Sequence, residues 1–147
     1  MRILGLDVGD RRIGVAISDA LGLTAQPLMV LARRGALRDD AQAVCDLIAQ
    51  HRVERVVIGL PLTMRGEVGI QAEKVTAFAD ALRRRLDVPI QLVDERLTTL
   101  QGSRALRAAG LSGRRQRHVI DRVAAQLILQ QFLETLRSGS PQSPEPS

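Results

Sequence analysis

The chain has 147 residues, enough for one domain whose hydrophobic core needs no disulfide and no structural metal. It is basic, with 21 Lys and Arg against 16 Asp and Glu, and it contains no Trp, no Tyr and two Phe. This composition disfavours recognition of nucleic acid by base stacking on aromatic side chains, so such a ligand would be held through its phosphates. One cysteine, Cys45, allows no intramolecular disulfide, and no signal peptide or apolar span of ~18 residues is visible. We therefore expect a reduced, cytoplasmic protein that is not bound to a membrane.

The chain begins with two short runs rich in Ile and Val, residues 3–8 and 13–18, which predict the two strands of a hairpin. Asp7 lies inside the first strand, on the same face as Gly5 and Gly9. Burying an unpaired carboxylate there is strongly unfavourable, so the pattern predicts a metal ion or a cationic partner beside Asp7. We expect the two glycines to clear this face for a ligand. The alternative, in which Asp7 caps a turn and the glycines only shape the hairpin, stays open at this point.

Strand and helix patterns alternate through the middle of the chain. They predict a short strand over residues 26–31 with Pro27 at its beginning or at a sheet edge, a helix over 37–50, a fully buried strand over 55–60, a mobile loop over 62–70, a helix with apolar spacing over 75–86 and a strand over 90–95.

The last third of the chain is predicted to hold two helices. Thr98 would cap the first, which ends at Gly110; an Arg-rich loop over residues 112–117 and a strongly apolar helix over about 118–136 follow. Residues 138–147 are rich in Ser and Pro, which predicts a disordered tail behind a domain over residues 1–137. The order of elements predicts an α/β fold with a mixed five-stranded sheet and helices on both faces.

Three carboxylates lie at positions that ordinary structure does not explain. Asp7 is inside the first strand, and Glu95 stands at the carboxyl end of the last strand, where open α/β sheets place their ligands. Asp121 interrupts the apolar helix just before Ala124 and Ala125, which are small enough to let this helix approach the sheet. Three acids from separate elements, without His or Cys, predict a site for Mg²⁺ or Mn²⁺. Ion pairs with the many arginines are the structural alternative.

Other polar residues near these positions fit structural roles better. Asp10, Asp19 and Asp94 are typical of turns and element ends. His118 fits the start of a helix beside a basic loop better than a general base.

Five short motifs occur in order along the chain: Ile-Leu-Gly-Leu-Asp-Val-Gly, Arg-Ile-Gly-Val-Ala-Ile-Ser-Asp, Val-Ile-Gly-Leu-Pro, Asp-Glu-Arg-Leu-Thr-Thr and Ile-Asp-Arg-Val-Ala-Ala. With them the chain resembles the YqgF (RuvX) family over roughly residues 1–137. The resemblance implies a ribonuclease H-like fold, similar to that of the Holliday-junction resolvase RuvC. It also implies a nuclease proposed to process the 5′ end of precursor 16S ribosomal RNA, with Holliday-junction resolution on DNA as the older proposal. Carried over by motif, the catalytic and metal-binding acids are Asp7, Glu95 and Asp121.

The chain departs from the family pattern in two places. Residues 63–67 read Thr-Met-Arg-Gly-Glu where the family usually has Asn-Met-Asp-Gly-Ser, so whatever this loop contacts can differ. The basic stretch before the last acid often carries Lys in the family and carries Arg here, which binds phosphate but cannot act as a deprotonated amine. We expect nucleic acid to be bound by Arg104, Arg107, Arg114, Arg115 and Arg117.

Two other functions stay open on the sequence. The opening motif also resembles the phosphate loop of the actin and sugar-kinase ATPases, although those need a second related domain and a much longer chain. The second open function is that of a non-catalytic module that binds nucleic acid or the ribosome and keeps the acids only as a metal-stabilised core. Phosphate binding and metal chemistry serve RNA and DNA alike, so precursor ribosomal RNA and branched DNA are both expected partners. The oligomeric state and the cleavage position do not follow from the residues.

Overall fold

The computed structural model describes residues 1–97 and 114–138, and the side chains of all of these except residues 97 and 114–121. In chain order its elements are β1 (Ile3–Val8), β2 (Arg12–Ser18), β3 (Ala25–Ala32), α1 (Leu37–His51), β4 (Arg55–Leu60), α2 (Ile70–Arg83), β5 (Ile90–Asp94), the short 3-10 helix η1 (Glu95–Leu97) and α4 (Arg114–Ser138).

The five strands form one mixed sheet in the order β3-β2-β1-β4-β5. The first three strands are joined by tight turns and pair antiparallel, whereas β4 and β5 pair parallel to β1 and to each other. Parallel pairs need a crossover, which α1 and α2 provide here. The predicted mixed five-stranded sheet is therefore confirmed, with Pro27 on its edge strand β3.

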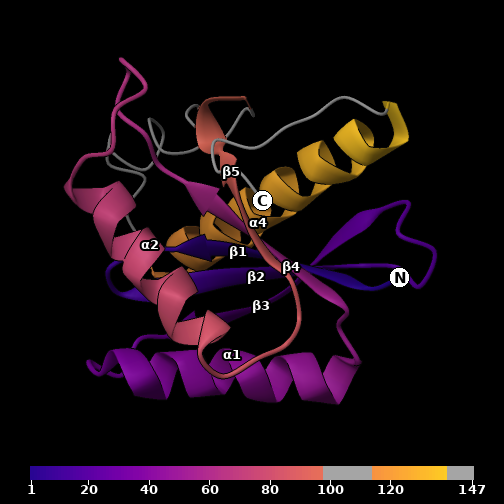
Figure 1. Ribbon diagram of the computed structural model, residues 1–147, viewed down its shortest axis with the longest axis horizontal. Helices are drawn as coiled ribbons and strands as arrows, with labels where there is room; N and C mark the ends of the chain where they lie inside the picture. The colour runs from indigo at the N-terminus through magenta and orange to yellow at the C-terminus, as the bar shows by residue number, and fades with distance from the viewer. Residues whose placement is uncertain (98–113, 139–147) are drawn as a thin grey trace.

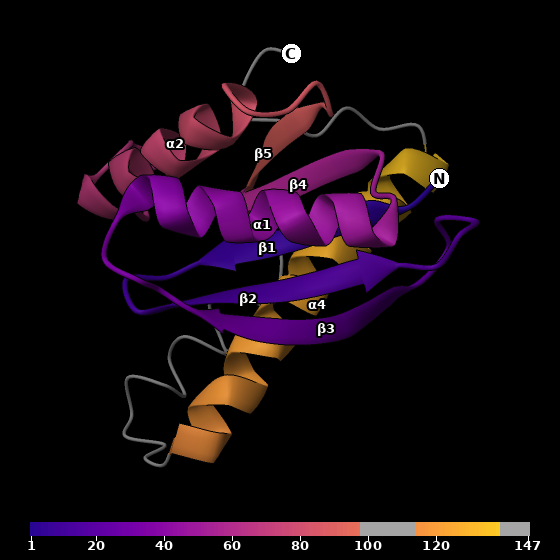
Figure 2. The same cartoon turned by 90° about the horizontal axis from the view of Figure 1, so that it is seen from below.

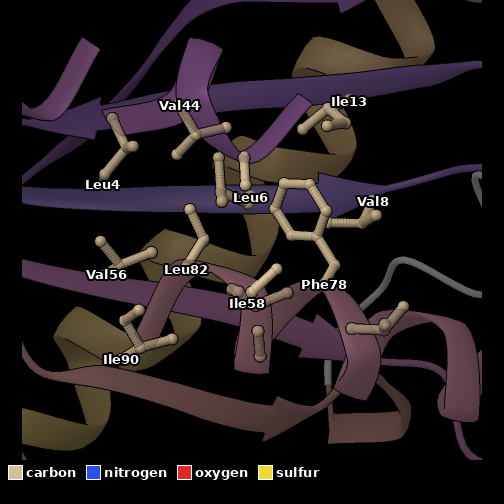
Figure 3. Close-up of a cluster of buried hydrophobic side chains, with 14 of the residues drawn as sticks. Leu4, Leu6, Val8, Ile13, Val44, Val56, Ile58, Phe78, Leu82 and Ile90 are labelled. Atoms are coloured by element: carbon tan, nitrogen blue, oxygen red, sulfur yellow. The ribbon is translucent and has the colours of Figure 1, made fainter. Parts of the chain in front are cut away.

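Helices cover both faces of the sheet, as Figures 1 and 2 show: α1 and α2 pack on one face, and α4 crosses the other. Each face has its own hydrophobic core. The larger core lies under α1 and α2, where Leu6, Ile58 and Phe78 meet (Figure 3). The smaller core lies under α4 and includes Val57 and Ile128. Because both faces are covered, β1 is buried along its whole length, as its apolar sequence predicts.

The helix α4 comes very close to the sheet where the strands carry glycine. A Cβ on Gly5 would lie 2.7 Å from the Cβ of Leu129 and 3.2 Å from the carbonyl oxygen of Ala125. Gly5 on the strand and Ala125 on the helix thus allow the close approach of α4 that the sequence predicted. The expectation of a ligand beside Gly5 is wrong, because α4 fills that space. Gly9 belongs to the β1–β2 turn, where its N–H donates to the carbonyl oxygen of Arg12 at 2.9 Å.

Several predicted boundaries are wrong, although the described elements themselves are confirmed. The helix predicted over residues 75–86 is α2, which runs over Ile70–Arg83 and so begins at the end of the segment predicted as a loop. Glu95 does not end β5 but begins η1. Residues 114–117, predicted as a loop, form the first turn of α4, because Arg and Gln are good helix formers even where no apolar residue is needed. Ser138, predicted to open the tail, is the last residue of α4. The helix predicted from Thr98 and the tail over residues 139–147 lie outside the described residues.

Cys45 packs against the larger core from α1, and burial raises the pKa of its thiol. It is a packing residue, as the helical pattern around it predicts. Within residues 1–97 and 114–138, no helix has the length and apolar character that crossing a membrane requires.

Candidate active site

Asp7 is a buried carboxylate in the middle of a strand, with an exposed fraction of 3%. Its cross-strand neighbour in β2 is Gly14, Gly5 stands two residues before it on β1, and Gly9 follows in the β1–β2 turn. The positions nearest to Asp7 on this face of β1 and β2 are therefore glycines.

Glu95 is the second buried carboxylate, also 3% exposed, and it follows β5 directly. Its side chain lies over Gly59 of β4: a Cβ on Gly59 would stand 2.8 Å from Oε1 and 2.9 Å from Cγ of Glu95. The same Cβ would stand 2.6 Å from Cδ1 of Ile128 in α4. Gly59 thus provides the space that Glu95 occupies between the sheet and α4, a role that was not predicted from the sequence. A glycine inside a buried apolar strand is the signal that was available.

The sheet register makes Asp7 and Glu95 neighbours. β1 and β4 pair in parallel up to Leu6 and Ile58, so one step further Asp7 stands beside Gly59, the residue that Glu95 covers. The two carboxylates share the face under α4, at the carboxyl ends of β1 and β5, the two strands that flank β4. Figure 1 shows β1 and β4 ending on the side of the molecule where α2 begins.

Asp94 and Arg96 hold the backbone on both sides of Glu95. The backbone N–H of Arg96 donates to Oδ1 of Asp94 at 2.9 Å, and Nη2 of Arg96 donates to Oδ2 at 2.6 Å. The hydrogen bonds from Arg96 lower the pKa of Asp94, so this carboxylate stays charged. Asp94 therefore has the structural role that the sequence predicts, and the pair fixes the direction in which Glu95 leaves the sheet.

The loop that departs from the family pattern lies against this pair. It closes on itself, since the Thr63 N–H donates to the Glu67 carbonyl at 2.9 Å and the Gly66 N–H to the Thr63 carbonyl at 2.8 Å. Nη1 of Arg96 lies 3.1 Å from where a Cβ on Gly66 would stand, and Gly66 has a φ of +81°, which favours glycine. Met64, at the tip, is 83% exposed. The altered loop is thus joined to the Glu95 turn through Arg96.

Asp121, the third predicted acid, lies in α4 one helical turn before Ala125, the residue that packs over Gly5. Its side chain is outside the described residues, so its convergence with Asp7 and Glu95 stays a prediction. Among the residues that the structure describes, no group of three or more His, Cys, Asp or Glu side chains is arranged to hold a metal. Three of the predicted nucleic-acid contacts lie in the first turn of α4, namely Arg114, Arg115 and Arg117. The other two, Arg104 and Arg107, lie outside the described residues.

Two of the remaining acids have the structural roles predicted for them. Asp10 is exposed and accepts hydrogen bonds from Lys74 at 3.2 Å and from Gln71 at 3.3 Å. Asp19 closes the β2–β3 turn by accepting the N–H of Leu23 at 2.7 Å. The side chain of His118 lies outside the described residues.

The donor set of the site fits a hard divalent cation. Asp7 and Glu95 offer carboxylate oxygens only, which are the ligands that Mg²⁺ and Mn²⁺ prefer. Two carboxylates buried next to each other repel, unless a cation or a proton compensates their charge. The residues therefore suit such an ion, with Asp121 as the candidate third ligand.

A protein-family model described as "RuvX: Holliday junction resolvase" matches residues 1–135. The chain belongs to the RuvX family. Relatives named "Putative pre-16S rRNA nuclease" include one from Desulforudis audaxviator, which is 48% identical over 139 residues and covers 95% of this chain and 98% of the relative. Another, from Moorella thermoacetica, is 51% identical over 136 residues and covers 92% and 96%. The names of the RuvX family and of these relatives both denote a nuclease, as the resemblance implied.

Solved structures confirm the fold of this RuvX-family chain. The RuvC of Thermus thermophilus, solved in complex with a Holliday junction substrate, aligns over 99% of both chains with a TM-score of 0.59 at 16% identity. The fowlpox virus resolvase, solved with Holliday junction DNA, aligns over 92% of this chain and 99% of its own with a TM-score of 0.57 at 12% identity. The RuvX chain therefore has the ribonuclease H-like fold of the RuvC resolvases.

Proposed function

We propose that this RuvX-family protein is a metal-dependent nuclease that hydrolyses phosphodiester bonds, with Asp7, Glu95 and Asp121 as its catalytic and metal-binding residues. The observation that carries the proposal is the pair of buried carboxylates, Asp7 and Glu95, at the carboxyl ends of β1 and β5, on either side of Gly59 in β4 and under α4. A structural ion pair explains one buried acid, but two acids over glycines at the ligand-binding edge of the sheet favour a cation site.

The chain would hold Mg²⁺ or Mn²⁺ through the oxygens of these acids. Such an ion, when bound, acts as a Lewis acid on the phosphate and lowers the pKa of a bound water. The low exposure of Asp7 and Glu95 strengthens their attraction for a cation, because the local dielectric is low. The Asp94–Arg96 pair and Gly59 orient Glu95, and preorganised ligands need no rearrangement during the reaction.

We propose precursor 16S ribosomal RNA as the substrate, in the cytoplasm and in association with the ribosome. The names of relatives 48% and 51% identical support this choice over DNA. A Holliday junction is the second candidate, supported by the description of the family model. Both substrates place a phosphodiester at the same acids.

The test is an Mg²⁺-dependent cleavage assay that offers precursor 16S RNA, a four-way DNA junction and short single strands side by side. We expect the wild-type chain to cut the RNA fastest, and Asp7→Asn and Glu95→Gln to abolish cleavage, since each amide keeps the size but removes a charged ligand. Asp10→Asn is the matched control, because Asp10 is exposed, lies in the turn that follows β1 and is paired with Lys74 of α2. It should cut at the wild-type rate.

Other outcomes decide between the alternatives. Faster cleavage of the junction makes the protein a resolvase. Tight binding without cleavage of any substrate makes it a non-catalytic module. If Asp7→Asn still cuts, the assignment of Asp7 as a catalytic ligand is wrong.

A further inference from the structure

A group of arginines stands at the turn where β1 meets β2, next to the end of β3. Arg12 pairs with Ala32 across β2 and β3, and the N–H of Arg33 donates to the carbonyl oxygen of Arg11 at 2.8 Å. Arg34 follows directly along the chain. We call Arg11, Arg12 and Arg34 the hairpin arginines.

The register connects this group to the candidate active site. Asp7 pairs with Gly14, and Arg12 is two residues before Gly14 on the same strand, so it lies on the same face of the sheet as Asp7. Two residues along a strand span about 7 Å, a distance that an arginine side chain covers. The glycines at positions 9 and 14 leave the surface between Arg12 and Asp7 without bulky side chains.

Arg33 supports this surface from the side of α1. Its Nη1 donates to the carbonyl oxygen of Gly9 at 2.8 Å, and its Nε donates to Oδ2 of Asp40 at 2.8 Å. Asp40 is 3% exposed and also accepts the N–H of Arg34 at 2.8 Å. This pair ties the β1–β2 turn, the end of β3 and the start of α1 into one unit that presents the hairpin arginines.

The sequence of this surface is rich in positive charge, because residues 9–12 and 32–40 contain five arginines and three acids. Two of the acids have ion-pair partners: Asp40 is matched by Arg33 at 2.8 Å and Asp10 by Lys74 at 3.2 Å. Arg11 and Arg34 are exposed, and Arg12 is half-buried.

We propose that the hairpin arginines bind the phosphates of a nucleic-acid strand where it leaves the carboxylates. This is a second phosphate-binding surface, formed by the β1–β2 turn and the end of β3 and separate in sequence from the arginines predicted before Asp121. The guanidinium forks match phosphate oxygens in two-point contacts, which favours a nucleic-acid backbone over other polyanions. This proposal rests on the proposed function, because it assumes that a nucleic-acid strand binds at Asp7. A strand bound there has phosphates within reach of Arg12.

The test measures binding in the full chain carrying Asp7→Asn, which should not cut its ligand. Labelled single-stranded RNA and DNA are titrated at a series of salt concentrations, with and without the pair Arg11→Gln and Arg34→Gln. Neutralising two phosphate-binding arginines should weaken binding and flatten the slope of log affinity against log salt by about 1.4 on a single strand. Arg84→Gln with Arg85→Gln is the matched control, since both residues are exposed at the far end of α2. It should leave the slope unchanged.

A slope that changes no more in the hairpin variant than in the control overturns the proposal, because the strand then does not contact these arginines. Cleavage by the wild-type chain is measured beside the binding. If the hairpin variant weakens binding and flattens the slope as expected but the wild-type chain cuts nothing, the hairpin arginines remain a phosphate-binding surface. The nuclease assignment is then wrong.

Discussion

Gly59 is the single residue on which the position of Glu95 depends. Gly59→Ala would place a Cβ 2.8 Å from Oε1 of Glu95 and 2.6 Å from Cδ1 of Ile128. We expect cleavage to fall far more than stability, because the carboxylate must leave its present position over Gly59, whereas overpacking of this kind costs about 1–3 kcal/mol. Cleavage rates and melting temperatures are measured together.

Gly22→Ala is the control for this prediction. Gly22 has a φ of +72° in the β2–β3 turn, so alanine there adds backbone strain without touching Glu95. If the two variants lose activity in the same proportion to their stability, Gly59 has only a packing role.

Asp19 gives the fold a dependence on pH away from the active site. The N–H of Leu23 donates to its carboxylate at 2.7 Å, and this bond is the main cause of its lowered pKa. A pKa that is lower in the folded state stabilises the protein above the unfolded pKa of about 3.9, and this stabilisation disappears as the pH falls through the folded value.

Asp19→Ala should therefore lower the melting temperature at neutral pH, and its difference from wild type should shrink below about pH 4. Thermal melts of both proteins across the acid range check this. If the difference in melting temperature between Asp19→Ala and wild type stays constant down to the lowest pH, the substitution acts by removing packing from the turn and not by removing a charged hydrogen-bond acceptor.

At the scale of elements, the strands and helices with clear apolar periodicity were predictable from the sequence. The helix α1 and the strand β4 agree with their patterns to within a residue, because burial on a fixed face determines both the pattern and the element. The sequence also predicted that Asp7 and Glu95 are unusually placed, since a charge inside or beside a buried strand conflicts with its surroundings, and both acids are buried in the structure.

What the sequence did not reveal depends on contacts between distant segments. Gly5 and Gly59 look alike as glycines in apolar strands, yet one receives the backbone of α4 and the other the side chain of Glu95. The Asp94–Arg96 pair was missed for a related reason, because two residues so close in sequence show no pattern until the chain turns. The Arg-rich start of α4 was misread as a loop because it has no apolar periodicity.

The charges at that start of α4 call for a functional reason. Its first turn contains no acid and carries Arg114, Arg115 and Arg117. Cations at a helix amino terminus are unfavourable by roughly 0.3–1 kcal/mol each, because they face the positive end of the helix dipole. Selection for stability therefore does not explain them, whereas binding of a phosphate backbone does.

Arg114→Gln with Arg115→Gln should weaken nucleic-acid binding and reduce the salt slope by up to about 0.9 for each duplex phosphate that the variant no longer binds. The helix should remain, because Gln and Arg have similar helix propensities. Circular dichroism and binding at several salt concentrations measure the two effects. An unchanged slope with an intact helix would leave these arginines without a role in phosphate binding.

At the scale of the whole molecule, the two cores have different consequences for function. The larger core joins α1 and α2 to the sheet and contains none of the proposed ligands. The smaller core places α4 on the other face, and the carboxylates of Asp7 and Glu95 lie on that face at the carboxyl ends of the strands. Binding of a cation would join β1, η1 and α4, which are far apart in sequence, so it should stabilise the fold as a unit.

Mg²⁺ should therefore raise the melting temperature of the wild-type chain and have a much smaller effect on Asp7→Asn. At a concentration of 100 Kd a bound ligand adds about 2.7 kcal/mol, or roughly 5–10 °C for a domain of this size. Without Mg²⁺ the variant should be as stable as the wild type or more so, because the amide fills the same space and no longer repels Glu95. If Asp7 instead serves as the partner of an arginine, Asp7→Asn should lose about 3–5 kcal/mol with or without Mg²⁺. Melting curves of both proteins in EDTA and across a Mg²⁺ series separate these cases. Asp10→Asn is the control for the loss of one carboxylate, and its melting temperature should respond to Mg²⁺ as that of the wild type does.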